Sequence, residues 1–346
     1  MQKYQLWTSD IYVTWCCLGT MTRWHQNTEQ DAHRQLDYAI WAGVNFIDTA
    51  EIYPIPPTAK TYTRTESYIG TWLQKSWARD QVVLASKMAG HGRDYIREGR
   101  WIHASDLPTA VQQSLDRLQT DYIDLYQLHR PQRPVSLWGD WTHHDDSSRS
   151  KEEITEHMTN VLLALKPLLA SWTLRTRWLS NETTRGTMQR SALCDQLDMP
   201  RPVSIQNAYS LVRREAEVDL AEYVYHEKTA FLAYSPLWWW VLSGKYMQWA
   251  YPEGSRYATR GKHRMQYYMN DATQARIQQF AHIAKKHDLT MTQLSLARCQ
   301  SRDFVTSTII WATHMDQLKE CISAFDIVLD PEVMKEIDAG IVDNIM

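Results

Sequence analysis

The chain is poor in cysteine and in long apolar runs, and each shortage excludes a class of protein. Its five cysteines are odd in number, scattered and without CxxC spacing. We therefore expect no disulfide framework and a reducing, cytoplasmic setting. No stretch approaches the roughly 18 apolar residues of a membrane span. The N-terminal MQKYQLWTSD lacks an apolar core, so no signal peptide is expected either.

An excess of one charge is also absent. The formal net charge is −3, and acidic and basic residues are mixed along the chain. Nucleic acids and anionic membranes attract basic stripes, so neither is expected as a partner. No metal is expected, because the adjacent side chains of 143–146 (HHDD) lack the spacing at which ligands converge on one ion. The expected partner is a small molecule, and the oligomeric state stays open.

Glycine is scarce and tryptophan is abundant. The chain has 12 glycines and 16 tryptophans, whereas glycine usage near the average of about 7% would give roughly twice as many glycines. Only glycine adopts left-handed backbone conformations without steric cost. Some tight turns are therefore expected to be made by other residues.

Short apolar segments alternate with helical patterns along the whole chain. The candidate strands are 15–20, 44–49, 82–87, 122–129, 176–181, 203–207, 230–234 and 305–310. The candidate helices are 29–42, 65–76, 107–118, 151–170, 183–197, 214–225, 273–287 and 315–324. Strands that alternate with helices indicate βαβ units and a parallel sheet. Eight such units predict one (β/α)₈ (TIM) barrel domain over residues 1–346. The segments 131–150 and 247–270 lack clear periodicity and follow strands, so we expect them as lids over the barrel mouth.

Four polar residues lie at or just past the C-terminal ends of predicted strands. Asp48 and Tyr53 follow one strand, Lys87 ends the next, and His129 ends the one after. Taken singly, each is more often an ion-pairing, hydrogen-bonding or packing residue. In a parallel barrel, however, such ends converge on one mouth, where chemistry takes place.

A carboxylate, a phenol, an ammonium and an imidazole together suit the reduction of a carbonyl group. The carbonyl oxygen needs a proton, which Tyr53 would donate. The ammonium of Lys87 would lower the phenol's pKa, Asp48 would hold Lys87, and His129 would orient the substrate. Because no side chain supplies a hydride, a nicotinamide cofactor is implied.

The chain resembles the aldo-keto reductase family over nearly its whole length. The matching segments are LGTMT (18–22), AGVNFIDTAEIYP (42–54), ASK (85–87), RLQTDYIDLYQLHRP (117–131), LSNET (179–183), IQNAYSL (205–211), AYSPL (233–237), LSGKY (242–246) and MDQLKE (315–320). Within the family they look most like the bacterial Tas-like reductases, relatives of potassium-channel β-subunits.

The resemblance implies a barrel that binds NADP(H), with Tyr53 as general acid and Asp48, Lys87 and His129 as its partners. Lys245 favours NADPH as the cofactor. The resemblance also implies cofactor contacts from Gly19, Thr20, Met21, Ser180, Asn181, Gln206, Tyr234, Ser235, Pro236, Leu237, Lys245, Thr313, Gln317 and Glu320. The expected activity is reduction of aldehydes or ketones. The alternatives are a cofactor-binding regulatory protein, as in the channel β-subunits, and an altered or designed barrel with impaired cofactor binding.

Several residues depart from the family pattern. Tryptophan replaces glycine or another small residue at 24, 178, 238–240 and 311, Cys321 replaces an asparagine, and Arg177 stands at an apolar strand position. Tryptophan permits neither φ > 0 without cost nor a close backbone approach to phosphate. Two interpretations stay open: the indoles cover the cofactor or one another in shifted loops, or they impair cofactor binding.

Overall fold

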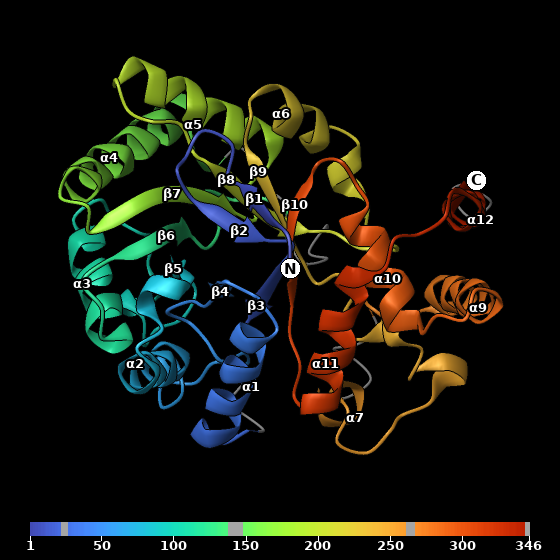
Figure 1. The fold of residues 1–346 in the computed structure, drawn as a ribbon. Coiled ribbons are helices and arrows are strands. Elements are labelled where there is room, and N and C mark those ends of the chain that lie inside the picture. Colours follow the sequence, from blue (N-terminus) through green and yellow to red (C-terminus); the bar gives the residue numbers. More distant parts are fainter. Residues whose placement is uncertain (22–26, 138–147, 261–266, 343–346) are drawn as a thin grey trace.

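The computed structural model describes residues 1–21, 27–137, 148–260 and 267–342, without the side chains of 177–178, 259–260 and 341–342. Within these ranges, eight parallel strands close into a barrel in the order β10-β3-β4-β5-β6-β7-β8-β9 (Figure 1). They are β3 (Cys16–Gly19), β4 (Phe46–Asp48), β5 (Val83–Met88), β6 (Ile123–Leu128), β7 (Leu174–Ser180), β8 (Ser204–Ala208), β9 (Ala230–Tyr234) and β10 (Val305–Ile310). The predicted (β/α)₈ barrel is confirmed.

Helices surround the barrel, as Figure 1 shows. They are α1 (Glu29–Trp41), α2 (Arg64–Ser76), α3 (Asp106–Leu118), α4 (Lys151–Ala170), α5 (Thr184–Gln196), α6 (Leu220–His226), α7 (Arg256–Arg260), α9 (Asp271–Lys286), α10 (Met291–Gln300), α11 (Met315–Ser323) and α12 (Pro331–Val342). The sequence determines their ends locally. The Thr28 hydroxyl accepts a hydrogen bond from the Asp31 amide at the start of α1, and Gly43 takes a φ of +87° just beyond its end.

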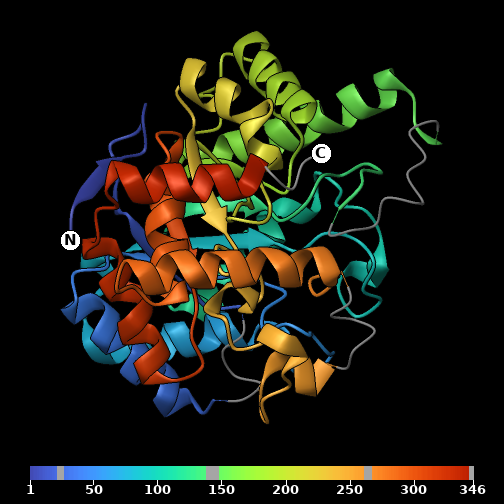
Figure 2. The same ribbon diagram turned by 90° about the vertical axis from the view of Figure 1, so that its right-hand side faces the viewer.

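An N-terminal hairpin that the sequence did not predict lies across one end of the barrel. Its strands β1 (Lys3–Gln5) and β2 (Tyr12–Thr14) are antiparallel. Leu6, Ile11 and Val13 from this hairpin are buried in the same apolar cluster as barrel residues such as Phe46. The Thr14 amide donates to Asn45 Oδ1 at 2.8 Å, just before β4. The hairpin therefore covers the N-terminal end of the strands, opposite the mouth (Figures 1 and 2).

Other departures from the predicted elements lie in the second half of the chain. The helix predicted at 214–225 is divided into a 3₁₀ turn, Glu215–Glu217, and α6, because Asp219 leaves the helical region at φ −139°. Helices α10 and α12 were not predicted. The segment 247–270 is not wholly irregular, since it contains a 3₁₀ turn at Met247–Trp249 and α7. In the described ranges, no helix is long and apolar enough to cross a membrane.

Candidate active site

A buried ion pair forms where β4 and β5 end at the barrel mouth. Lys87 Nζ donates to Asp48 Oδ1 at 2.5 Å and to the Thr49 carbonyl at 2.8 Å. Both charged side chains are almost fully buried, with relative accessibilities of 0% for Lys87 and 3% for Asp48. Because β4 and β5 are paired in register, the two side chains meet inside the barrel. In a buried site, this geometry holds the ammonium in one position.

Two amides complete the hydrogen bonding of Asp48. Its second oxygen, Oδ2, accepts from Gln206 Nε2 at 2.8 Å and from Gln127 Nε2 at 3.2 Å. Gln206 was predicted at this site, as a cofactor contact, whereas Gln127 was not predicted at all. The signal for Gln127 was present: it is an amide within an otherwise largely apolar buried strand, two residues before His129. The carboxylate is therefore fixed by donors from three strands.

Tyr53 and His129 lie next to this pair. The Tyr53 ring centroid is 5.0 Å from Lys87 Nζ and 5.5 Å from the His129 ring centroid, with the two rings at 77°. Tyr53 is only 6% exposed. The structure therefore brings all four predicted residues together, from the ends of three neighbouring strands.

Burial controls the protonation states here. It raises the pKa of Tyr53 well above its ordinary value, and the negative charge of Asp48 raises this pKa further. The prediction that Lys87 lowers the pKa of Tyr53 is therefore wrong, because the cost of burying a phenolate dominates. Burial, with Lys87 and Arg130 adding repulsion, holds the pKa of His129 well below its ordinary value, so the imidazole is neutral. The pKa of Lys87 is lowered by burial, against the opposing effect of Asp48.

Three predicted cofactor contacts lie beside the four residues. Asn181 Nδ2 donates to the His129 carbonyl at 2.8 Å and to Ser180 Oγ at 3.1 Å. The Tyr234 hydroxyl donates to Asn181 Oδ1 at 2.5 Å. A cavity of about 240 Å³ opens next to them. Its lining includes Asn181, Asn207, Arg213 and Tyr234. Among the described residues, its lining includes none of Asp48, Tyr53, Lys87 and His129, so the cavity lies beside Asn181 and Tyr234 and not beside the predicted proton donor.

The predicted cofactor contacts at the end of β3 and just after it hold the backbone around the site. Thr20 Oγ1 donates to the Asp48 carbonyl at 2.8 Å. The Met21 carbonyl accepts from the Ile55 amide at 2.8 Å, which ties down the loop that carries Tyr53. At Gly19, an added Cβ would lie 2.7 Å from Ile309 Cγ2, so this position must stay small. These contacts show a scaffolding position, and their predicted role towards a cofactor stays a prediction.

The loop after β9 places three tryptophans in a backbone conformation that glycine favours. Ser235, Pro236 and Leu237 are buried at its start. The next three residues, Trp238–Trp240, all take left-handed backbone conformations, with φ of 44°, 60° and 68°. Their indoles contact other aromatic rings at tilted or edge-to-face angles: the centroids of Trp238 and Trp239 lie 5.0 and 4.7 Å from that of Tyr268, and the centroid of Trp240 lies 5.4 Å from that of Trp311. In this loop the tryptophans therefore cover one another and neighbouring tyrosines.

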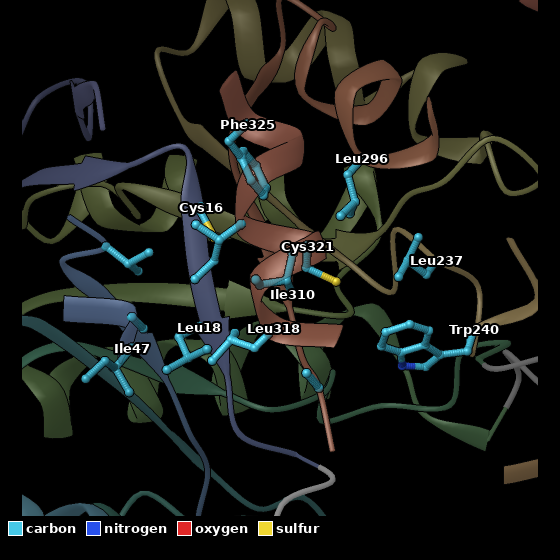
Figure 3. Close-up of a cluster of buried hydrophobic side chains, with 14 of the residues drawn as sticks. Cys16, Leu18, Ile47, Leu237, Trp240, Leu296, Ile310, Leu318, Cys321 and Phe325 are labelled. Carbon is cyan, nitrogen blue, oxygen red and sulfur yellow. The ribbon is translucent and has the colours of Figure 1, made fainter. Parts of the chain in front are cut away.

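Three further residues that were predicted as cofactor contacts, Thr313, Gln317 and Glu320, do not all lie together. The amide and the hydroxyl of Thr313 both donate to Gln317 Oε1 at 3.1 Å, so these two lie together. Glu320 instead accepts from Thr290 Oγ1 at 2.7 Å, at the start of α10. Cys321 is fully buried in an apolar cluster with Leu237 and Trp240 (Figure 3). Burial raises the pKa of this thiol, so it offers no charge.

Some predicted features lie outside the described residues. These are Trp24, the HHDD run at 143–146, and the side chains of Arg177 and Trp178.

Comparison with known proteins identifies the family. The sequence profile described as Aldo/keto reductase family matches residues 16–341. The chain belongs to the aldo/keto reductase family.

Individual relatives agree with this assignment. The chain is 40% identical over 346 aligned positions to Protein tas of Escherichia coli (strain K12), covering 98% of this chain and 97% of that protein. It is 33% identical over 252 positions to an aldo-keto reductase of Babesia bovis, covering 70% of this chain and 88% of that one. An uncharacterized oxidoreductase of Bacillus subtilis (strain 168), YrpG, is 28% identical over 97% of this chain and 94% of its own. Family membership makes this chain an oxidoreductase.

Proposed function

We propose that this chain reduces aldehydes or ketones to alcohols with NADPH as the cofactor. The observation that supports this most is the placement of Lys87 Nζ, 2.5 Å from Asp48 and 5.0 Å from the Tyr53 ring, beside a neutral His129 at the barrel mouth. When bound, the cofactor supplies the hydride that the carbonyl carbon receives. The residues described here supply the proton and hold the carbonyl.

Tyr53 is the proposed proton donor to the carbonyl oxygen. Its raised pKa keeps the hydroxyl protonated at neutral pH, so an acid is available throughout the working range. After donation, the nearby Lys87 ammonium stabilises the phenolate that remains. Neutral His129 is suited to donate a hydrogen bond to the same oxygen. Asp48 positions Lys87, and Gln127 and Gln206 position Asp48.

The cofactor residues fit a phosphorylated nicotinamide dinucleotide in chemical type. Ser180, Asn181 and Gln206 would hold the carboxamide, and Tyr234 would lie against the ring. At the other end, Lys245 has its pKa lowered to about 8 by burial and by the neighbouring charge of Arg256. Two adjacent cations favour a ligand with an additional phosphate, which supports NADPH over NADH.

The test compares the native chain with Tyr53→Phe, using an activated aromatic aldehyde and the loss of NADPH absorbance. We expect turnover to fall by about 10²–10⁴-fold in the variant, the range for a general acid, while NADPH affinity stays the same. Equal turnover by both proteins would overturn the role of Tyr53. NADPH binding without turnover by either protein would indicate the regulatory alternative instead.

A further inference from the structure

Indole rings join the two loops that follow β9 and β10. These are the seventh and eighth strands of the barrel, and in TIM barrels the loops after them frequently form a phosphate site. Trp240 from the first loop and Trp311 from the second meet edge to face, with ring centroids 5.4 Å apart. A contact between two indoles therefore bridges the two loops.

Two cations lie on these indoles. The guanidinium carbon of Arg256, in α7, is 4.0 Å from the Trp239 ring centroid and 4.3 Å from that of Trp311. Lys245 Nζ is 4.9 Å from the centroid of Trp240. In the described part of the chain, no salt bridge involves Lys245. Cation–π attraction is strongest where the cation is desolvated, and Lys245 is half-buried.

The backbone fixes the indoles in this arrangement. Trp238, Trp239 and Trp240 are consecutive left-handed residues, a conformation that glycine adopts freely and that places a bulky Cβ against the backbone in any other residue. Trp240 is 3% exposed and anchored in the cluster that includes Leu237 and Cys321 (Figure 3). Glycine at 239 and 240 would remove one indole from each cation, leaving Arg256 on Trp311 and Lys245 on Tyr246, whose ring centroid is 5.1 Å from Lys245 Nζ.

We propose that Trp239, Trp240 and Trp311 form an indole clamp that holds Arg256 and Lys245 and competes with the phosphates of a dinucleotide for both cations. These three residues then determine cofactor affinity at the phosphate end and keep it low. The clamp rests on the proposed function, because the phosphates in question are those of its cofactor. The nicotinamide end is separate, since the contacts of Asn181 and Gln206 lie among Asp48, His129, Ser180 and Tyr234.

The test removes the clamp from each loop in turn. The double variant Trp239→Gly/Trp240→Gly opens the loop after β9 and also relieves its left-handed backbone. Trp311→Ala opens the loop after β10. The φ of Trp311 is not positive, so this variant removes an indole without relieving any left-handed backbone strain. Trp172→Gly is the matched control: it is left-handed at φ 60° and 66% exposed, and it lies between α4 and β7, at the end opposite the mouth.

The dissociation constants of NADPH and of phosphate-free 1-benzyl-1,4-dihydronicotinamide are measured by calorimetry for the four proteins. We expect NADPH to bind at least about tenfold tighter to the double variant and several-fold tighter to Trp311→Ala, a gain near 1.4 kcal/mol for the former. The phosphate-free probe should change by less than about twofold throughout. Trp172→Gly should bind both as the native chain does.

Three results would overturn the clamp. The first is a double variant that melts at or above the melting temperature of the native chain and yet binds NADPH no more tightly than the native chain does. The second is a gain confined to the glycine variant and absent from Trp311→Ala, which would assign the effect to backbone strain. The third is an equal gain for the phosphate-free probe. If the clamp variants bind NADPH more tightly but no protein turns over, the clamp stands and the proposed reductase fails.

Discussion

The two sides of the barrel mouth differ in how their charges are satisfied. On the side of β4 to β8, Asp48 accepts hydrogen bonds from Lys87, Gln127 and Gln206. On the side of β9 and β10, Lys245 and Arg256 lie on indole faces. The first side is built on strands in fixed register, so side-chain identity there is enough to form the site. The second is built on loop backbone, where three consecutive tryptophans take left-handed conformations.

The strongest test of the first side is Lys87→Met. Loss of the ammonium removes the group that stabilises the Tyr53 phenolate, so turnover should fall by about 10²–10⁴-fold. Removal of one partner also leaves Asp48 as a buried unpaired charge, which typically costs about 3–5 kcal/mol of stability. Urea unfolding with turnover assays measures both effects.

The double variant Asp48→Asn/Lys87→Met provides the control for this prediction. Because it removes both charges, it should regain most of the lost unfolding free energy while turnover stays low. If Lys87→Met unfolds like the native chain, the buried pair does not stabilise this side of the mouth as argued. If the double variant regains turnover, the role of Lys87 is wrong.

The second side predicts a pH dependence of cofactor affinity. The pKa of Lys245 is lowered to about 8 by burial and by Arg256. Below that pH the side chain is charged and attracts phosphate, and above it the charge is lost. NADPH affinity should therefore fall as pH rises through 8, by up to about tenfold between about pH 7 and about pH 9.

Titrations of Lys245→Met at the same pH values are the control. This variant should bind NADPH weakly and with little change across the range. A phosphate-free nicotinamide should show no such dependence in either protein. If the NADPH affinity of the native chain does not change through pH 8, Lys245 does not contact the phosphates. The contrast between the two sides of the mouth would then be weaker.

The sequence predicted the first side of the mouth better than the second for a physical reason. All eight barrel strands were predicted within about two residues, because apolar runs that alternate with amphipathic helices leave few other folds. The ends of those strands then placed Asp48, Lys87 and His129 together. Gln127 was missed because an amide in an apolar strand was not interpreted as an inward-facing partner.

Other misses had local signals that were overlooked. Thr290 and Gln293 form a capping box at the start of α10, and Pro331 begins α12, both of which are readable helix signatures. The pKa of Tyr53 could not be predicted, because its direction depends on the depth of burial. The contact between Trp240 and Trp311 also required the structure, because sequence spacing does not determine which rings meet across two loops.

The smallest expected effect isolates the backbone strain that the clamp variants also relieve. Trp77 ends α2 in a left-handed conformation, at φ 52°, and is 87% exposed, so its ring buries little surface. A left-handed conformation costs a residue with a Cβ about 1–2 kcal/mol, which glycine would avoid. Glycine also raises the entropy of the unfolded chain, and this offsets about 0.5–1 kcal/mol of the gain. Trp77→Gly should therefore raise the unfolding free energy by up to about 1 kcal/mol, whereas Trp77→Ala, which keeps its Cβ, should not. Urea unfolding of both variants measures the difference. If alanine stabilises as much as glycine, loss of the exposed indole, and not relief of backbone strain, is responsible at this position.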